Sequence, residues 1–358
     1  MTNPTDPIAL DYDKPLLATL GGMPKDDKHR VILEAAHLKM DPKHPITPFT
    51  PAKEACFSKD PKRYILELDK QKKTIVTPSY FSHLSNFDAN ISFGETPNFY
   101  DYANTASFWV DFAAVLLGGG VFRTGFAQEE VMCMEMPDLA NAAAITTKPM
   151  NCRDPYGTKG VLDGSPTPIV IKGLNRVMHI PANVNRQSID TWTIAELKGE
   201  IAKWMLPKPQ SQINVLAMAA PELPNDRPKL PSSRAYDLDT QMDLFNTFVA
   251  GFELAVEQSA KGVLINTGRI GCGVFNHDPR IVYVLQVFAA KFVGVNLMLW
   301  GYNHSDGSNN NVYRARACIN ELMGDMARSQ DKSISTLLHS AQQKMEGWIR
   351  PKPIDPVD

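Results

Sequence analysis

Two adjacent glutamates, Glu129 and Glu130, follow a glycine run at a spacing that indicates a catalytic or ligand-binding site. Gly118, Gly119 and Gly120 remove every Cβ along about 10 Å of backbone, which permits positive φ angles and close approach to a ligand. Seven residues later come an amide and the two glutamates, at a predicted helix start. Adjacent helical residues point about 100° apart, so the two carboxylates cannot do the same job. One can act as the acid at a glycosidic bond while the other holds a sugar hydroxyl.

A second glycine-rich segment lies at residues 266–278. Both segments follow an apolar run and precede a helical pattern, so each is predicted at the carboxyl end of a strand, where open α/β sheets bind ligands. The turn between Gly268 and Phe275 can offer consecutive backbone N–H groups to a diphosphate without Lys or Arg. A diphosphate loop together with a carboxyl group near a sugar describes an ADP-ribose site.

The two glycine-rich segments do not match the sequence motifs of other nucleotide-binding sites. The dinucleotide motif G-x-G-x-x-G needs a last glycine, but the first segment has Arg123 there and the second has Asn276. The phosphate loop of nucleotide hydrolases needs a lysine where the first segment has Phe126. Hydride transfer and nucleoside triphosphate hydrolysis are therefore excluded.

Apolar runs with strand character must position these segments. The predicted strands cover residues 108–116, 169–171, 177–180, 213–219, 262–266 and 295–300. Helical patterns lie near residues 28–41, 61–72, 127–143, 193–205, 239–259, 279–293, 312–328 and 331–348. Nearly continuous apolar strands joined by helices are typical of a sheet covered on both faces. We expect a mostly helical N-terminal extension over residues 1–99 and one three-layer α/β/α domain over residues 100–358.

The composition excludes several classes of protein. The chain has 358 residues, of which 43% are hydrophobic and 21% charged, with a formal net charge of −2. It lacks the basic excess that binding to a phosphate backbone needs, so no nucleic-acid partner is expected. The five cysteines share no C-x-x-C spacing and no Asp/His cluster has the spacing of metal ligands. We therefore expect neither a metal ion nor another cofactor.

The compartment is predicted from apolar segments and cysteine use. Residues 281–300 are apolar, but Gln286, Lys291 and Asn296 interrupt them, so a buried helix and strand are expected in place of membrane insertion. The N-terminus shows no basic region followed by an apolar core, as a Sec-type signal peptide would. We expect a reducing compartment, either the cytoplasm or, after export without such a signal, a host cell in which the chain is an effector.

The pattern G-G-G, seven residues, Q-E-E resembles the signature of poly(ADP-ribose) glycohydrolases, a branch of the macrodomain fold. The similarity continues upstream into residues 110–113. It also extends to T-G-x-x-G-C-G-x-F-x-x-D at residues 267–278, which is similar to that family's diphosphate loop. The similar stretches cover roughly residues 100–135 and 260–302. This resemblance implies a macrodomain-like mixed sheet.

The resemblance also implies a role for each matching residue. Glu130 resembles the catalytic acid, and Glu129 its companion that holds ribose hydroxyls. Gln128 would support the loop. Asp111 resembles the aspartate at the base of the site, and Asp101 an acidic adenine reader. The other implied substrate contacts are the glycine run, the diphosphate loop and a stacking ring: Gly118, Gly119, Gly120, Thr267, Gly268, Gly271, Cys272, Gly273, Val274, Phe275 and Tyr302.

Three departures surround the distal ribose and its acceptor. Ala114 stands where the family usually has Asn, Ile270 replaces a Trp, and Asn276 with His277 replaces two glycines. His277 is either a ligand contact at the rim of the site or a surface turn residue, and we expect the turn residue. These changes favour single ADP-ribose units on protein side chains, notably arginine, over poly(ADP-ribose) as the substrate.

The resemblance implies a hydrolase that releases ADP-ribose from modified protein or from poly(ADP-ribose), with the N-terminal extension as a surface for a protein partner. The alternative is an ADP-ribose-binding module that does not cleave. Simpler interpretations exist for single residues as well. Glu129 and Glu130 would complement a helix N-terminus, where a carboxylate contributes roughly 0.3–1 kcal/mol. Asp111 is costly to bury without partners, so it has either a hydrogen-bonded core role or a site role.

Overall fold

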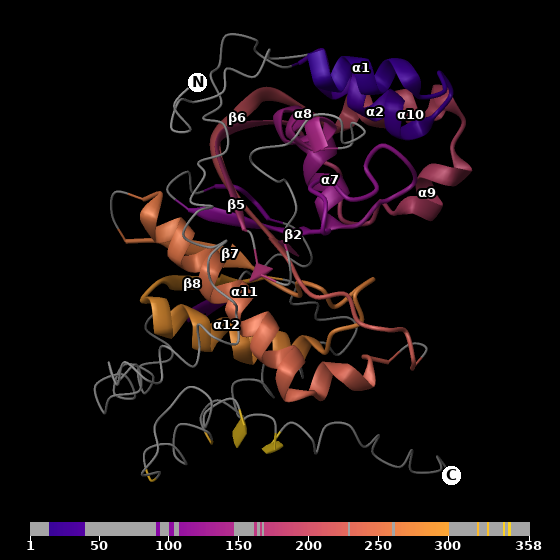
Figure 1. The fold of residues 1–358 in the computed structure, drawn as a ribbon. Coiled ribbons are helices and arrows are strands. Elements are labelled where there is room, and N and C mark those ends of the chain that lie inside the picture. Colours follow the sequence, from indigo (N-terminus) through magenta and orange to yellow (C-terminus); the bar gives the residue numbers. More distant parts are fainter. Residues whose placement is uncertain are drawn as a thin grey trace, which may run out of the picture. The chain divides into compact units, whose positions relative to one another are not determined.

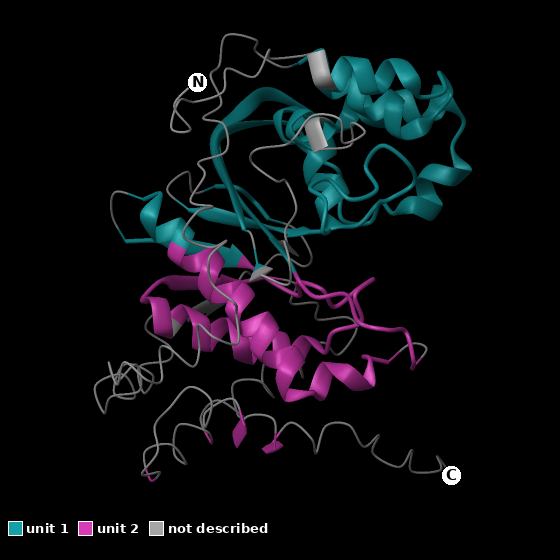
Figure 2. Cartoon of the chain, viewed as in Figure 1, with its two compact units in different colours: residues 1–57, 99–219, 254–266 teal, residues 58–98, 220–253, 267–358 magenta. Residues whose placement is uncertain are grey.

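The computed structural model describes residues 14–39, 91–93, 100–103, 107–146, 161–162, 165–166, 168–227, 230–259 and 262–300, and six positions between 321 and 344. The elements in these ranges are shown in Figure 1. The chain divides into two compact units (Figure 2). Unit 1 comprises residues 1–57, 99–219 and 254–266, and unit 2 comprises residues 58–98, 220–253 and 267–358.

Unit 1 is built on a mixed sheet. Its strands, in the order in which they pair, are β7 (Leu264–Thr267), β2 (Phe108–Ala113), β6 (Met205–Ala219) and β5 (Ile169–Met178). Strand β2 runs parallel to both β7 and β6, whereas β5 is antiparallel to β6. Buried residues occupy nearly all of β2, because strands inside such a sheet are covered on both faces. The predicted mixed α/β sheet is therefore confirmed.

Two short helices pack on the sheet of unit 1, and the first of them carries Glu129 and Glu130. Helix α7 (Gln128–Glu135) contacts β2 and β5, and helix α8 (Pro137–Thr146) contacts β5 (Figure 1). The sequence predicts one helix over 127–143, but the structure breaks it at Met136, whose φ is −123° and ψ is 87°. Pro137 explains the break, since the residue before a proline is driven into an extended conformation.

The described residues of unit 1 include four further helices. Helices α1 (Lys14–Gly22) and α2 (Lys28–His37) pack on α8, and α2 also contacts α7. Helix α9 (Arg186–Thr191) leads into α10 (Ile194–Trp204), which packs against α2. The predicted helices near 28–41 and 193–205 are confirmed. The short strands β3 (Val161–Leu162) and β4 (Ser165–Pro166) pair with each other.

Unit 2 contains most of helix α11 (Leu238–Glu257), the short helix η1 (Ser233–Tyr236) and helix α12 (Pro279–Val293). Strand β1 (Ile91–Phe93) runs parallel to β8 (Asn296–Leu299), and α12 packs on β8. Helix α12 has Asp278 as its N-cap and Pro279 in its first turn. It ends at Gly294, whose φ of 85° is left-handed, where the sequence predicts the end.

Several predicted elements differ from those in the structure or lie outside the described residues. Two predicted strands, 169–171 and 177–180, are one strand, β5, whose register shifts between Ile171 and Met178. The predicted helix over 61–72, most of those over 312–328 and 331–348, and Tyr302 lie outside the described residues. The domain boundary after residue 99 stays a prediction. No helix among the described residues is long and apolar enough to cross a membrane.

Candidate functional site

Glu130 lies in the first turn of α7 and is held there by two backbone amides. Its Oε2 accepts a hydrogen bond from Ala127 N at 2.7 Å, and its Oε1 accepts one from Gly120 N at 2.8 Å. Ala127 precedes the helix and has no polar side chain to cap it, so Glu130 supplies a partner for its N–H group. The side chain is buried, with 7% of the residue exposed. Glu130 therefore joins the helix start to the glycine run.

Glu129 bridges the end of β2 to the same glycine run. Its Oε2 accepts from Ala114 N at 2.8 Å, and its Oε1 accepts from Gly118 N at 2.6 Å. Burial raises the pKa of Glu129 to about 10, with a further increase from the charge of Asp111, and the two amide bonds oppose the increase only in part. The two glutamates thus meet at the glycine run but bond different amides there, Gly118 for Glu129 and Gly120 for Glu130.

The glycine run approaches the two glutamates closely. A Cβ on Gly119, whose φ is 48°, would lie 2.6 Å from an oxygen of each of Glu129 and Glu130. A Cβ on Gly118, whose φ is 88°, would lie 2.3 Å from the Cβ of Ala143 in α8. The sequence predicts close approach to a ligand at these glycines. In the structure, the approach is to the protein's own carboxylates and to α8.

Gly125 is a site residue that sequence reasoning missed. A Cβ here would lie 2.5 Å from Oε1 of Glu130 and 2.7 Å from its carboxyl carbon. The Gly125 N–H group donates to the carbonyl of Gly120 at 3.0 Å, which closes the turn around the Glu130 side chain. Its position five residues after Gly120 was the available signal, but the sequence alone does not show that a side chain fills the turn.

Asp111 lies on β2, fully buried, with no partner within the described part of the chain for either carboxylate oxygen. Burial raises the pKa of Asp111 to about 8, and the charge of Glu130 raises it further. The hydrogen-bonded core role, one of the two predicted alternatives, is not found among these residues. A buried carboxyl group without a partner is costly, which favours the alternative role in a site.

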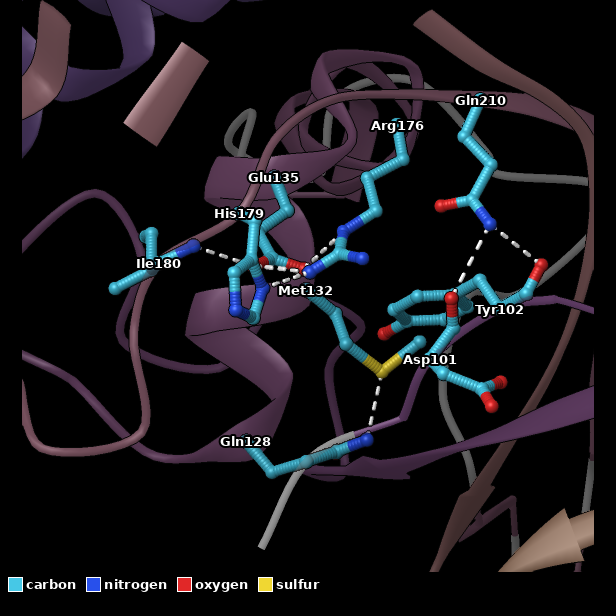
Figure 3. Close-up of polar contacts among 9 residues, drawn as sticks. All are labelled: Asp101, Tyr102, Gln128, Met132, Glu135, Arg176, His179, Ile180 and Gln210. Carbon is cyan, nitrogen blue, oxygen red and sulfur yellow. Dashed lines mark hydrogen bonds and ion pairs between the residues drawn. The ribbon is translucent and has the colours of Figure 1, made fainter. Parts of the chain in front are cut away.

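Gln128 fastens α7 to β2. Its Oε1 accepts from Phe112 N at 2.9 Å, and its Nε2 donates to the carbonyl of Val110 at 3.0 Å. Figure 3 shows the same Nε2 beside Sδ of Met132, one turn further along α7. We predicted that Gln128 supports the glycine loop, but its hydrogen bonds go to the strand. It therefore aligns the helix that carries both glutamates with the strand that carries Asp111.

The far end of α7 is anchored by a buried ion pair. Glu135 accepts two hydrogen bonds of 2.8 Å from Nε and Nη2 of Arg176 in β5, and a third from Ile180 N at 2.7 Å (Figure 3). Arg176 also stacks over the ring of Tyr102, with its Cζ 4.8 Å from the ring centroid. Nothing in the sequence connects these three segments, so Glu135 and Arg176 were missed as positioning residues.

Asp101 precedes Tyr102 and is exposed. Its Oδ1 accepts from Ala103 N at 2.9 Å, and Nε2 of Gln210 donates to the carbonyls of Asp101 and Tyr102 at 3.1 and 2.7 Å (Figure 3). Tyr102 itself has a positive φ of 53°, which is uncommon for a residue other than glycine. The segment that carries Asp101 is thus held in a defined conformation, and no partner for its Oδ2 is found among the residues that the structure describes.

The second predicted cluster belongs to unit 2. Its loop is closed by backbone hydrogen bonds from Cys272 N to Arg269 O at 3.1 Å and from His277 N to Gly271 O at 3.1 Å. Nε2 of Gln286 in α12 donates to Gly268 O at 2.7 Å, which ties the start of the loop to that helix. Burial raises the pKa of the Cys272 thiol, which keeps it in the neutral form.

The tip of this loop presents unused donors. Among the described residues, no acceptor is found for the backbone N–H groups of Gly273, Val274 and Phe275. Val274 is 76% exposed and Gly273 is exposed as well, whereas Phe275 is partly buried. Thr267, one residue before the loop, is fully buried, and its hydroxyl has no partner within the described ranges. Consecutive free amides are the arrangement that binds anions.

The base of the loop serves the structure. Asp278 caps α12, pairs with Arg280 and accepts from the hydroxyl of Tyr236 at 2.7 Å. His277 is 2% exposed, and its Nε2 lies 2.7 Å from the carbonyl of Pro221. The prediction of a surface turn residue is therefore wrong for His277. Its burial lowers its pKa to about 4, so the ring is neutral near pH 7 and can pack against Gly271 without a charge.

Tyr302, the predicted stacking ring, lies outside the described residues. Within those that are described, no group of three or more His, Cys, Asp or Glu side chains is placed to hold a metal ion. The structure brings Asp111, Gln128, Glu129 and Glu130 together with the glycine run in unit 1. The diphosphate-type loop belongs to unit 2.

No protein-family model matches the sequence. No curated protein sequence matches it significantly. Among solved structures, the chain is similar to poly(ADP-ribose) glycohydrolase from Thermomonospora curvata at 16% identity and a TM-score of 0.40, over 81% of this chain and 98% of that one. It is also similar to the Deinococcus radiodurans enzyme in complex with ADP-ribose at 15% identity and a TM-score of 0.38, over 76% and 99%.

Proposed function

We propose that this chain hydrolyses the glycosidic bond at the distal ribose of ADP-ribose and releases ADP-ribose from its acceptor. The observation that carries the proposal is the buried pair Glu129 and Glu130, each fixed by two backbone amides around a glycine turn. Preorganised carboxyl groups at a helix start suit acid–base chemistry, because their position does not have to be found during the reaction.

Glu130 is the proposed catalytic acid. It transfers its proton to the acceptor atom as the bond to the ribose carbon breaks, and the oxocarbenium-like cation is stabilised by the substrate's own diphosphate. Glu130 then takes a proton from the attacking water, which restores the acid. Glu129, whose pKa is raised to about 10, carries a proton near pH 7 and holds a ribose hydroxyl. Asp111 forms the base of the proposed site.

The remaining contacts are proposed from the chemistry of each group. The amides of Gly273, Val274 and Phe275, for which the described ranges hold no acceptor, would bind the diphosphate, because backbone N–H groups bind phosphate oxygens without a basic side chain. Asp101 would read the adenine amino group through its exposed carboxylate. Tyr302 would stack on the substrate.

We further propose that the acceptor is a protein side chain, with single ADP-ribose units on arginine as the first candidate. Ala114 supports this choice, since its methyl group offers no hydrogen bond at the end of β2, where a polymer-cleaving site would use an amide. The chain would then reverse mono-ADP-ribosylation, in its own cytoplasm or as an effector in a host cell.

Release of free ADP-ribose from a substrate panel tests the proposal. The panel contains poly(ADP-ribose) and proteins that carry single ADP-ribose units on arginine, glutamate or serine, each treated with wild type and with Glu130→Gln. We expect release from the arginine-linked protein and a loss of at least about a hundredfold in the variant. Release that survives Glu130→Gln would refute the role of Glu130.

A binding module without hydrolysis is the competing function, and the same experiment separates the two. If no substrate releases ADP-ribose while calorimetry shows tight binding of ADP-ribose, the chain is a reader of the modification. Release from poly(ADP-ribose) alone would keep the enzyme and refute the proposed acceptor. The absence of both release and binding would refute the ADP-ribose site itself.

A further inference from the structure

We infer that His29, in the N-terminal helix α2, is a positioning residue for the catalytic glutamate. This inference rests on the proposed function. His29 is 6% exposed, and its Nε2 lies 2.8 Å from the carbonyl oxygen of Gly125. Because a carbonyl oxygen only accepts, Nε2 must carry the hydrogen and donate it. A residue from the predicted N-terminal extension thus hydrogen-bonds the turn that surrounds Glu130.

Gly125 is the point at which this hydrogen bond acts on Glu130. The Gly125 backbone approaches the Glu130 carboxyl group so closely that a Cβ would lie 2.5 Å from Oε1. Its N–H group donates to Gly120 O at 3.0 Å, and Gly120 N donates in turn to the same Oε1 at 2.8 Å. A shift of Gly125 would therefore move one wall of the turn and one hydrogen-bond donor of Glu130 together.

The imidazole also contacts the residue after Gly125. The ring of Phe126 meets His29 edge to face, with centroids 6.4 Å apart and an interplanar angle of 80°. The next residue, Ala127, donates its N–H group to Oε2 of Glu130 at 2.7 Å. His29 thus touches the segment between the two amides that hold the two oxygens of Glu130.

Helix α2 is itself fixed by contacts that do not involve the glycine turn. Asp27 caps the helix by accepting from His29 N at 2.9 Å and Arg30 N at 3.1 Å. Nζ of Lys28 donates to the carbonyls of Ile189 and Asp190 in α9, each at 2.7 Å. These bonds give His29 a fixed base from which its ring can hold the turn.

The test compares three variants of the full chain. His29→Leu introduces an apolar side chain of similar size that has no hydrogen-bond donor. His29→Gln places an amide N–H group near the position of Nε2. Lys28→Ala is the matched control, because it removes hydrogen bonds of the neighbouring residue without touching the glycine turn. Thermal unfolding of each variant shows whether the fold is retained.

The first measurement is hydrogen–deuterium exchange in peptides that cover residues 116–130. We expect His29→Leu to raise exchange of this segment by about tenfold, the equivalent of one ordinary hydrogen bond, with His29→Gln and Lys28→Ala close to wild type. Unchanged protection in His29→Leu would overturn the inference. Equal deprotection in Lys28→Ala would overturn it too, because general loosening of α2 would then be the cause.

The second measurement is kinetic, on the substrate that the wild type cleaves. We expect kcat of His29→Leu to fall about tenfold with KM within about threefold, and His29→Gln to recover most of the rate. A rise in KM with kcat retained would contradict positioning of the acid. If the wild type cleaves nothing, the proposed function fails, while the exchange measurement still decides whether His29 holds the turn.

Discussion

Asp111 is a single buried carboxyl group in an otherwise apolar strand, and its protonation is linked to stability. Its pKa of about 8 in the folded chain exceeds the ordinary 3.8, so the folded protein holds this proton where the unfolded chain has lost it. The group therefore lowers the free energy of unfolding progressively as the pH rises from about 4 to about 8, and has its full effect above that range.

Replacing this carboxyl group with an amide should stabilise the chain. We expect Asp111→Asn to raise the free energy of unfolding at pH 8 by at least about 1.4 kcal/mol, and to make little difference at pH 4. Denaturant unfolding at both pH values measures the difference. Activity should fall in the same variant, because the proposed site loses the carboxyl group at its base, as stability and function often oppose each other in a site.

Glu135→Gln is the matched control for this effect. Glu135 is also a buried carboxyl group, but it has three hydrogen-bond donors and an ion pair with Arg176. Its removal should destabilise by about 3–5 kcal/mol, because Arg176 is left as a buried charge without its partner. If both variants change stability in the same direction, the absence of a partner for Asp111 is not the cause.

At the scale of elements, helix α7 and the glycine turn work as one unit. The turn closes only because Gly119 and Gly125 carry no side chains where the glutamates lie. We expect Gly119→Ala to lower activity by about a hundredfold, because the Cβ would displace both carboxyl groups from their hydrogen bonds. Kinetic assays together with circular dichroism would separate this loss from unfolding.

Gly199→Ala provides the comparison. Gly199 lies inside α10, and a Cβ there would meet no atom within 4 Å. The change should leave activity unaltered and stabilise the chain by roughly 0.5–1 kcal/mol, since alanine favours a helix interior over glycine. Equal loss of activity in both variants would contradict a specific role for the turn.

The sequence predicts the elements well where a local pattern encodes them. The start of α7, the end of α12 at Gly294 and the apolar strands all follow from residue types a few positions apart. The break at Met136 could also have been predicted from Pro137. The hydrogen bond from His29 to Gly125 and the pairing of Glu135 with Arg176 could not, because each joins segments that only the folded backbone brings together.

In the candidate site, too, the local sequence predicts the residues but not their contacts. Glu129 and Glu130 were found by their spacing, but the spacing does not show that Ala114, Gly118, Gly120 and Ala127 donate to them. Asp111 could be identified from the sequence because a carboxyl group in an apolar run is costly to bury. Only the structure shows that neither of its oxygens has a hydrogen-bond partner among the described residues. Burial of His277 was missed since a polar pair in a loop is normally exposed.

At the scale of the whole molecule, ligand binding should raise stability by mass action. We expect ADP-ribose at a hundred times its Kd to stabilise the chain by about 2.7 kcal/mol, which corresponds to a rise of a few degrees in Tm. Differential scanning calorimetry measures the shift. Adenosine at the same concentration is the control ligand, because it lacks the diphosphate. An equal shift with adenosine would contradict binding through the amides of residues 273–275.

The two raised carboxyl pKa values in unit 1 make folding of this chain a proton-consuming reaction. Near pH 6 an unfolded chain exposes Asp111 and Glu129 as carboxylates, whereas the folded chain buries both in neutral form. On folding, these two groups take up about two protons, and His277, whose pKa falls to about 4, releases somewhat less than one, so the net uptake is about one proton. The calorimetric heat of unfolding would include the ionisation heat of whichever buffer receives that proton, so phosphate and an amine buffer would give different heats for the same transition.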